Sequence, residues 1–349
     1  MNVIFDVNHP ADFHTFKNTA RVLEKQGHSV LFTVSKKDVS LDLVNRANVE
    51  YVHLGSYGKT LPSKVTSLPL LTKRLIDVAK RFRPDIIVGW GSVRGAFASK
   101  LLKSHTYYVD INENDYAIQL YLLYHPFIDY ILTPKCYSKN LGQKQVRYKG
   151  YHELAYLHPR YFRPNPEVLR KLGHSKHDKI VTIRLVSWDA WHDYGKKGVK
   201  DEIEALIKEL SELATILISC EGTCPESVKR FEINEKLAPD EFHSLLYYSS
   251  LYIGEGATTA AESAILGTPA IYINPIELGY IKELENKYGL VHSFHPNFAQ
   301  KAFKLATNLL TERNLKAVSM RKARRVLKDS IDVTRFYVRF LTNIEGNSP

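Results

Sequence analysis

Short apolar runs of strand length alternate with helical patterns along most of this sequence, and this alternation restricts the fold more than any other feature. The first 34 residues show one complete unit. It consists of an apolar run at residues 3–7, apolar residues at helical spacing from Phe13 to Leu23, a stop at Gly27 and a second apolar run at residues 29–34. Because strands that alternate with helices form parallel sheets with helices on both faces, the sequence predicts an α/β fold.

The alternation stops once, in the proline- and aromatic-rich segment 150–166, and resumes near Lys179. A chain of 349 residues is also about twice the length of a typical domain. We therefore expect two doubly wound, Rossmann-like α/β domains, residues 1–155 and 156–312, that face each other across a cleft. The basic helical pattern of residues 313–349 is expected to form a C-terminal helix that crosses back to the first domain.

The charge of the chain favours anionic partners. Lysine and arginine outnumber aspartate and glutamate by 48 to 37, which gives a formal net charge of +11. Such a surplus is typical of proteins that bind phosphorylated metabolites, nucleic acid or an acidic membrane surface. Because the sequence has no zinc-finger, homeodomain or RNP signature, nucleic acid is not expected as a partner.

Cysteine content and hydropathy narrow the class of protein further. Cys136, Cys220 and Cys224 are too few and too scattered for a disulfide framework, and no second Cys/His pair completes a zinc site with the last two. No segment offers the roughly 20 apolar residues that a membrane-spanning helix needs, and the N-terminus has no signal-peptide pattern. These features predict a soluble cytoplasmic protein without a bound metal or cofactor.

Residues 254–263, GEGATTAAES, run from the end of an expected strand into an expected helix. Small residues at the start of a helix let backbone N–H groups approach a phosphate, and the helix dipole favours negative charge there. Thr258 and Thr259 add hydroxyl donors, and Glu262 is placed to accept hydrogen bonds from two ribose hydroxyls. A tight strand–helix turn with ordinary capping is the alternative that the sequence leaves open.

Residues 238–275, APDEFHSLLYYSSLYIGEGATTAAESAILGTPAIYINP, resemble the nucleotide-sugar half-site of GT-B glycosyltransferases. Two further segments support the resemblance, RPDIIVGWGS at residues 83–92 and RLVSW at residues 184–188. The chain most resembles a poorly characterised family of predicted glycosyltransferases from archaea and bacteria. The peptidoglycan lipid-intermediate N-acetylglucosaminyltransferase and the hydrolysing UDP-N-acetylglucosamine 2-epimerases are more distantly similar.

The resemblance implies a donor site in the second domain. It implies that the donor diphosphate binds the backbone of Gly256, Ala257, Thr258 and Thr259, that the ribose binds Glu262, and that a uracil-type base binds near Leu237. Arg184 and Ser187 are candidate pyrophosphate ligands, since a guanidinium donates two parallel hydrogen bonds to phosphate oxygens; a surface salt bridge is the alternative for Arg184. Asn274 and Glu277 follow an expected strand, where this superfamily often contacts donor-sugar hydroxyls.

The first domain is expected to bind the acceptor. Sugar transfer with inversion needs a base that takes the proton of the acceptor hydroxyl, and Asp12 or His14 could supply it. The peptidoglycan enzyme has a glycine-rich loop with a histidine here, whereas this sequence lacks the glycines and has Asp12 near the histidine's position. A capping role for Asp12 and a buried, hydrogen-bonded role for His14 stay open. Gly91 and Ser92, between another strand and helix, are candidates for contact with a sugar.

These features predict a metal-independent glycosyltransferase that moves a sugar from a nucleotide-diphosphate donor, UDP-linked above all, to a surface polysaccharide or glycolipid acceptor. A UDP-N-acetylhexosamine 2-epimerase is the alternative enzyme, with Asp110, Glu113 and His192 as its available acids and bases. A nucleotide-sugar-binding protein without catalytic activity is a third alternative. Basic residues and leucines of segment 64–83 suit peripheral contact with an anionic membrane.

Overall fold

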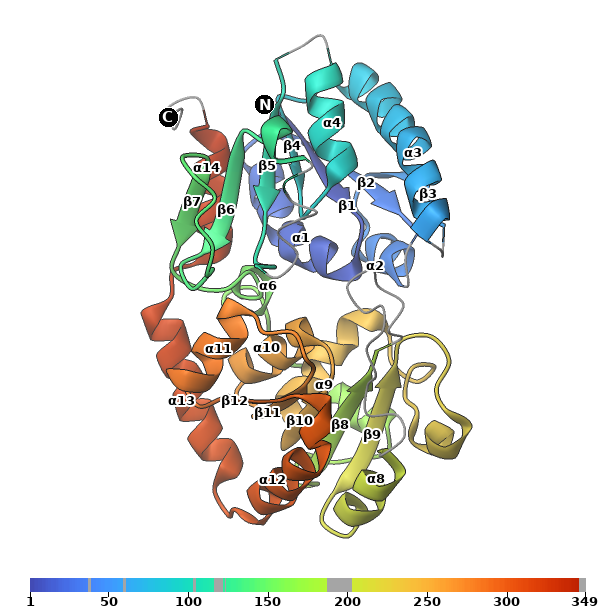
Figure 1. The fold of residues 1–349 in the computed structure, drawn as a ribbon, viewed down its shortest axis with the longest axis vertical. Coiled ribbons are helices and arrows are strands. Elements are labelled where there is room, and N and C mark those ends of the chain that lie inside the picture. The colour runs from blue at the N-terminus through green and yellow to red at the C-terminus, as the bar shows by residue number, and fades with distance from the viewer. Residues whose placement is uncertain are drawn as a thin grey trace. The chain divides into compact units, whose positions relative to one another are not determined.

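The structure, a computed structural model, describes residues 1–36, 39–58, 61–102, 105–115, 122, 124–186 and 203–344. The chain forms two compact units, shown as a ribbon in Figure 1. Unit 1 comprises Met1–Tyr161 and Ile331–Pro349, and unit 2 comprises Phe162–Ser330. The segment expected as one C-terminal helix, residues 313–349, is therefore divided, since its first part belongs to unit 2 and its second part to unit 1.

Unit 1 is built on a seven-stranded parallel sheet in the order β3-β2-β1-β4-β5-β6-β7. Its strands are β1 (Asn2–Val7), β2 (Ser29–Ser35), β3 (Tyr51–Gly55), β4 (Ile86–Gly89), β5 (Tyr107–Ile111), β6 (Tyr130–Pro134) and β7 (Gln145–Tyr148). The chain adds β2 and β3 on one side of β1 and all later strands on the other side. The sheet therefore has a topological switch point between β1 and β4, where open α/β sheets bind ligands.

Helices cover both faces of this sheet. The helices of unit 1 are α1 (Pro10–Lys25), α2 (Ser40–Ala47), α3 (Leu61–Phe82), α4 (Val93–Leu101), α6 (Leu154–Leu157) and α14 (Val333–Thr342), with a 3₁₀ turn at His125–Phe127. Ile4 and Ile87 pack with apolar residues of α3 and α4 on one face. On the other face Phe5 lies 5.5 Å from Phe32 and 5.3 Å from Phe16 of α1, measured between ring centroids. Because alternate residues of a strand point to opposite faces, unit 1 has a core on each side.

Unit 2 is built on a five-stranded parallel sheet in the order β12-β11-β10-β8-β9. Its strands are β8 (Ile180–Leu185), β9 (Thr215–Cys220), β10 (Leu251–Gly254), β11 (Ala270–Ile273) and β12 (Val291–Phe294). β9 lies on one side of β8, and β10, β11 and β12 follow on the other side. The switch point of this sheet is therefore between β8 and β10. The two doubly wound parallel sheets confirm the expected α/β fold class.

The helices of unit 2 also form two layers. They are α7 (Glu167–Lys171), α8 (Ile203–Ser211), α9 (Phe242–Tyr248), α10 (Ala257–Ile265), α11 (Gly279–Asn286), α12 (Ala299–Thr311) and α13 (Leu315–Asp329), with 3₁₀ turns at Glu226–Phe231, Pro239–Glu241 and Pro296–Phe298. Val181 and Ile183 pack with α8 and α12, whereas Ile180 packs with α7 and α9. Among the helices that the structure describes, none has the length and apolar character needed to cross a bilayer.

Candidate functional site

The carboxyl edge of the unit 2 sheet carries the donor-site candidates. Gly254, the last residue of β10, pairs with Arg184 of β8 on one side and with Tyr272 of β11 on the other. The two-residue turn Glu255-Gly256 then leads into α10. Because β8 and β10 flank the switch point, this turn occupies the position where doubly wound sheets bind their ligands.

The first turn of α10 has no capping side chain from its N-cap residue. That residue is Gly256, with φ −87° and ψ 119°, and a glycine offers no side-chain acceptor to the first N–H groups of the helix. Gly256, Ala257 and Thr258 are half-buried, and Thr259 is buried. A helix start made of small residues, without a capping side chain, can donate its N–H groups to an anion.

Buried contacts hold this turn in place. A Cβ atom on Gly254 would collide with the hydroxyl oxygen of Tyr252 and lie only 3.0 Å from the carbonyl oxygen of Arg184, so this position requires glycine. The side-chain amide of Asn274 donates to the carbonyl of Glu255 (2.8 Å), and the buried Glu255 carboxylate accepts from the N–H of Val186 (3.0 Å). Asn274 therefore anchors the turn, and its contact with a donor sugar stays a prediction.

Arg184 lies in β8 beside this turn, and its side chain is 24% exposed. Its Nη1 atom donates to the hydroxyl of Ser219 (2.9 Å), and its Nη2 atom donates to the Glu221 carboxylate (2.8 Å). The aromatic ring of Phe242 lies 5.4 Å from the guanidinium carbon. Burial alone lowers the pKa of Arg184, but the charged partners, Glu221 foremost, more than reverse this effect. Arg184 is thus a permanently charged group fixed at a strand end.

The remaining donor-site candidates differ in their surroundings. Glu262 is buried, and its Oε1 atom lies 2.8 Å from Nε2 of His243, a partner that the sequence did not indicate. Leu237 is half-buried and packs against the apolar cluster between α7 and α9. Glu277 is exposed and forms an ion pair of 2.5 Å with Lys282. Ser187 lies outside the described residues. The ribose, base, sugar and phosphate contacts expected of these residues stay predictions.

The base candidates of unit 1 lie in the first turns of α1, directly after β1. Oδ2 of the buried Asp12 accepts hydrogen bonds from the backbone N–H groups of Asn8 (2.8 Å) and His9 (3.0 Å), so Asp12 completes a capping box. Nδ1 of the buried His14 lies 3.1 Å from Nζ of Lys17. Both residues thus have structural contacts, and their catalytic role stays a prediction.

Gly91 and Ser92 shape the loop between β4 and α4. Gly91 has φ +61°, which favours glycine, and its N–H donates to the Asp110 carboxylate (2.8 Å). Ser92 is the N-cap of α4, where its hydroxyl oxygen accepts from the N–H of Gly95 (3.1 Å). Its own N–H donates to the hydroxyl of Tyr108 (3.1 Å). These contacts fix the loop at the switch point of unit 1, and contact of either residue with a sugar stays a prediction.

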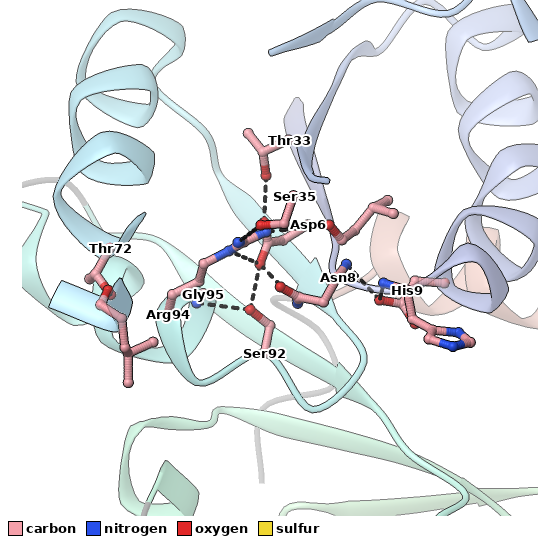
Figure 2. A network of polar contacts seen from close by, with 12 residues as sticks. Asp6, Asn8, His9, Thr33, Ser35, Thr72, Ser92, Arg94 and Gly95 are labelled. Carbon is pink, nitrogen blue, oxygen red and sulfur yellow. Dashed lines mark hydrogen bonds and ion pairs between the residues drawn. The ribbon is translucent and has the colours of Figure 1, made fainter. Parts of the chain in front are cut away.

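An ion pair that the sequence did not reveal lies under this switch point. Oδ1 of Asp6 and Nη2 of Arg94 are 2.7 Å apart, and both side chains are fully buried. Figure 2 shows Arg94 and the hydroxyls of Thr33 and Ser92 converging on the Asp6 carboxylate, the Thr33 bond being 2.7 Å long. A single charged residue within the apolar run VIFDV was the available signal, because an inward-facing aspartate in a buried strand needs a partner.

Asp110, within β5, and Glu113, just after it, are buried acidic groups of unit 1. Burial raises the pKa of Asp110 to about 7 and that of Glu113 to about 8. The imidazole of His152 contacts the Glu113 carboxylate through Nδ1, and its Nε2 atom lies 3.6 Å from Oε1 of Glu153. Glu113, His152 and Glu153 each have one ligand atom within 4.8 Å of the other two. This cluster has the donor atoms to hold a divalent cation. His192, the third epimerase candidate, lies outside the described residues.

The two cysteines of unit 2 are bonded to each other. Cys220 and Cys224 form a disulfide that closes the turn after β9, a single bridge that the sequence did not indicate. A single bridge between residues four positions apart is compatible with the low cysteine count, which excludes only a multi-bridge scaffold. The Glu232 carboxylate lies close to the two sulfurs, but cysteines joined in a disulfide have no thiolate to offer a metal ion.

The family comparison covers almost the whole chain. The family model described as "Protein of unknown function (DUF354)" matches residues 1–330. The chain belongs to this family. Over 304 residues it is also 25% identical to "Uncharacterized protein MJ0665" of Methanocaldococcus jannaschii, an alignment that covers 84% of this chain and 88% of the relative.

Solved structures resemble this DUF354 protein along nearly its full length. The S. aureus MnaA–UDP structure has a TM-score of 0.72 at 13% identity and covers 99% of this chain and 98% of that chain. The Streptomyces sp. SF2575 glycosyltransferase SsfS6 with thymidine diphosphate has a TM-score of 0.65 at 12% identity, covering 98% and 99%. The Neisseria meningitidis UDP-GlcNAc 2-epimerase bound to UDP-GlcNAc has a TM-score of 0.58 at 13% identity, covering 94% and 99%. At these identities the likeness shows the fold, which is the expected GT-B fold.

Proposed function

We propose that this protein is a glycosyltransferase that transfers a sugar from a UDP-linked donor to a glycan or lipid-linked acceptor of a surface polysaccharide or glycolipid. The turn from Gly254 to Thr259 carries the proposal, since a helix start without a capping side chain follows β10 at a switch point, next to Arg184 of β8. Similar structures that hold UDP or thymidine diphosphate support a nucleoside diphosphate as the ligand of this fold.

In this proposal the donor diphosphate binds the backbone N–H groups of residues 256–259 and the guanidinium of Arg184. Negative charge grows on the leaving UDP as the glycosidic bond breaks, and donors already fixed in position stabilise that charge without a metal ion. Ser187 adds a phosphate contact, Glu262 binds the ribose, and backbone groups near Leu237 bind the base. Asn274 and Glu277 contact hydroxyls of the transferred sugar.

Unit 1 is proposed to bind the acceptor and to supply the base. Either Asp12 or His14 takes the proton of the acceptor hydroxyl, and Gly91 and Ser92 border the acceptor site. Asp12→Asn and His14→Gln test this assignment separately, with donor affinity and turnover measured for each variant. Loss of turnover with unchanged donor affinity identifies the base. Unchanged turnover in both variants contradicts the assignment, and inactivity of the wild-type protein with every acceptor favours a binding protein without catalysis.

We also propose that the protein works at the cytoplasmic face of an anionic membrane, where lipid-linked acceptors are presented. α3 carries basic residues and exposes Leu70, whose side chain is 51% exposed. A basic helix with an exposed apolar residue suits such a surface. Co-sedimentation with vesicles at low salt tests this placement, and equal binding to neutral and anionic vesicles contradicts it.

A thermal-shift panel of nucleotides and nucleotide sugars tests the donor site. A ligand at a hundred times its Kd stabilises the folded protein by about 2.7 kcal/mol, which gives a visible rise in Tm. UDP and UDP-sugars are expected to raise Tm more than the corresponding adenosine compounds. The absence of any shift across the panel would remove the proposed function.

The variant Arg184→Ala tests the contribution of Arg184 to UDP binding. A hydrogen bond to a charged group contributes about 1.5–3 kcal/mol, so the variant is expected to bind UDP about 10- to 150-fold more weakly. Arg170→Ala is the matched control, since Arg170 is an exposed arginine of the same unit that pairs with Glu167, away from the strand ends. Equal affinity of the two variants for UDP contradicts the assigned role of Arg184.

A UDP-N-acetylhexosamine 2-epimerase is the second candidate, and the buried acids within and just after β5 favour it. Such an enzyme needs groups that donate and accept protons near neutral pH, and burial brings the pKa of Asp110 and of Glu113 into that range. Incubation with UDP-N-acetylglucosamine alone separates the two candidates. Release of the 2-epimer or of free UDP without an acceptor supports the epimerase, whereas turnover that requires an acceptor supports the transferase.

A further inference from the structure

A surface hollow of about 680 Å³ lies on unit 1, away from the carboxyl edge of its sheet. Residues from α1, α14 and the segment before Phe162 line it, among them Val22, Arg160, Tyr161, Arg335, Val338 and Arg339. We call it the arginine hollow. Its volume is within the range of small-molecule binding sites.

The lining of the arginine hollow is strongly cationic. Three arginines line the hollow, and two of them pair with one acid, Asp332, whose Oδ2 atom lies 3.3 Å from Nε of Arg160 and 3.6 Å from Nε of Arg335. The hydroxyl of Tyr161 donates to the same carboxylate (2.9 Å). Asp332 thus forms ion pairs with two of the three guanidinium groups. Three arginines and one aspartate give the hollow a net charge of +2.

The guanidinium groups keep their hydrogen-bonding capacity. Within the described part of the chain, none of the three donates a hydrogen bond to a protein acceptor, and Arg339 forms no ion pair. The side chains of Arg160 and Arg335 are 51% and 66% exposed. Three guanidinium groups around one hollow, two of which share the single carboxylate of Asp332, can bind phosphate oxygens in pairs.

We propose that the arginine hollow binds the phosphate group of a phosphorylated ligand. Val22 and Val338 give the hollow an apolar part beside its charged one, so the ligand carries an uncharged portion next to its phosphate. Both a phosphorylated metabolite and the headgroup of an anionic phospholipid have this chemistry. The lining residues indicate a phosphate group, and a comparison of free phosphate with lipid vesicles distinguishes a metabolite from a headgroup.

This site is separate from the proposed transfer site. α1 has 16 residues and is therefore about 24 Å long. Asp12 lies in its first turn, beside the switch point, whereas Val22 lies in its last turn, beside the arginine hollow. A phosphate bound at one end of α1 does not reach the loops at the other end. The inference therefore does not depend on the proposed function.

Calorimetric titration with inorganic phosphate tests the proposal, with Arg335→Ala/Arg339→Ala as the main variant. Each charge-assisted hydrogen bond lost weakens binding, so the affinity is expected to fall by at least about tenfold. Arg335→Lys/Arg339→Lys keeps both positive charges but removes the paired N–H donors of the guanidinium groups. This variant is expected to lose part of its affinity for phosphate. Arg170→Ala/Arg230→Ala is the matched control, because it removes two exposed arginines of unit 2 and leaves the hollow intact.

The source of the phosphate follows from a second measurement with the same variants. Vesicles of phosphatidylglycerol and phosphatidylcholine are compared with vesicles of phosphatidylcholine alone, at low salt. Binding of free phosphate that Arg335→Ala/Arg339→Ala removes identifies a metabolite site, and loss of binding to the anionic vesicles alone identifies a lipid headgroup site. Equal losses in the unit 2 control overturn the proposal, as does phosphate binding that only Arg184→Ala abolishes.

Discussion

Replacement of Asp6 by asparagine tests the buried ion pair of unit 1. The Asp6 carboxylate accepts from Nε (2.9 Å) and Nη2 (2.7 Å) of Arg94 and from the hydroxyl of Thr33 (2.7 Å). Asparagine keeps the shape of the side chain, but it removes the negative charge and turns an NH₂ group toward these donors. Arg94, whose side chain is 0% exposed, then keeps a buried positive charge without a carboxylate.

The burial of both partners sets the size of the effect. Removing one member of a buried ion pair typically costs about 3–5 kcal/mol, because the remaining charge stays in a medium of low polarity. We therefore expect Asp6→Asn to lower the free energy of unfolding of unit 1 by about 3–5 kcal/mol. Glu167→Gln, which removes one member of the exposed pair with Arg170, is expected to leave the free energy of unfolding unchanged within error.

Urea unfolding measures this difference without the ionic screening that guanidinium chloride introduces. Trp90 is the one tryptophan of residues 1–161, and in a Trp188→Phe/Trp191→Phe background its fluorescence reports on unit 1, where its ring contacts that of His152 (4.3 Å between centroids). Asp6→Leu/Arg94→Met removes both charges and is expected to cost less than the sum of the two single variants. A loss below 1 kcal/mol in Asp6→Asn would refute the reasoning that the variant leaves the Arg94 charge buried without a partner.

Three further predictions concern the two units. Gly254→Ala is expected to lower the free energy of unfolding by about 1–3 kcal/mol, measured in urea, because the added methyl group collides with Tyr252. Gly256→Ala makes only ordinary contacts, so it is expected to keep its stability and to bind UDP more weakly in calorimetry. Burial raises the pKa of Asp110 to about 7 in the folded protein, well above its ordinary value in the unfolded chain. The free energy of unfolding is therefore expected to fall as the pH rises from about 4 to about 7. Asp110→Asn is expected to remove up to about 4 kcal/mol of that fall, measured between pH 4 and pH 8. Burial lowers the pKa of Lys316 to about 7, so above that pH this side chain is protonated in the unfolded chain but neutral in the folded protein. The free energy of unfolding is therefore expected to rise by about 2 kcal/mol from pH 7 to pH 9. Lys316→Met is expected to abolish this rise.

The sequence was sufficient to predict the sheets because their central strands are continuous apolar runs. β1, β8 and β10 are buried on both faces, and such strands are recognisable without knowledge of their partners. β7 and β12 were not predicted. They lie at sheet edges, where QVRY and VHSF mix polar and apolar residues and are only partly buried, so that neither shows an apolar run.

Most contacts within the candidate site could not be predicted from the sequence. Periodicity assigns a residue to a face of a helix or strand, but it does not name the residue that faces it from another element. Asp6 and Arg94 are 88 positions apart, and Arg184 and Glu221 are 37 positions apart. The sequence therefore indicated candidate residues at strand ends, whereas the structure was needed to show that Arg184 pairs with Glu221 and that Glu262 contacts His243.

The N-termini of the helices explain why the donor is assigned to unit 2. At the switch point of unit 1, His9 accepts from the N–H of Ala11 and Asp12 accepts from two further N–H groups, so side chains already occupy the start of α1. Ser92 caps α4 in the same way. At the switch point of unit 2, α10 starts at a glycine that offers no capping side chain. Since a capped helix start has fewer N–H groups to donate, the same fold position favours an anion more in unit 2 than in unit 1.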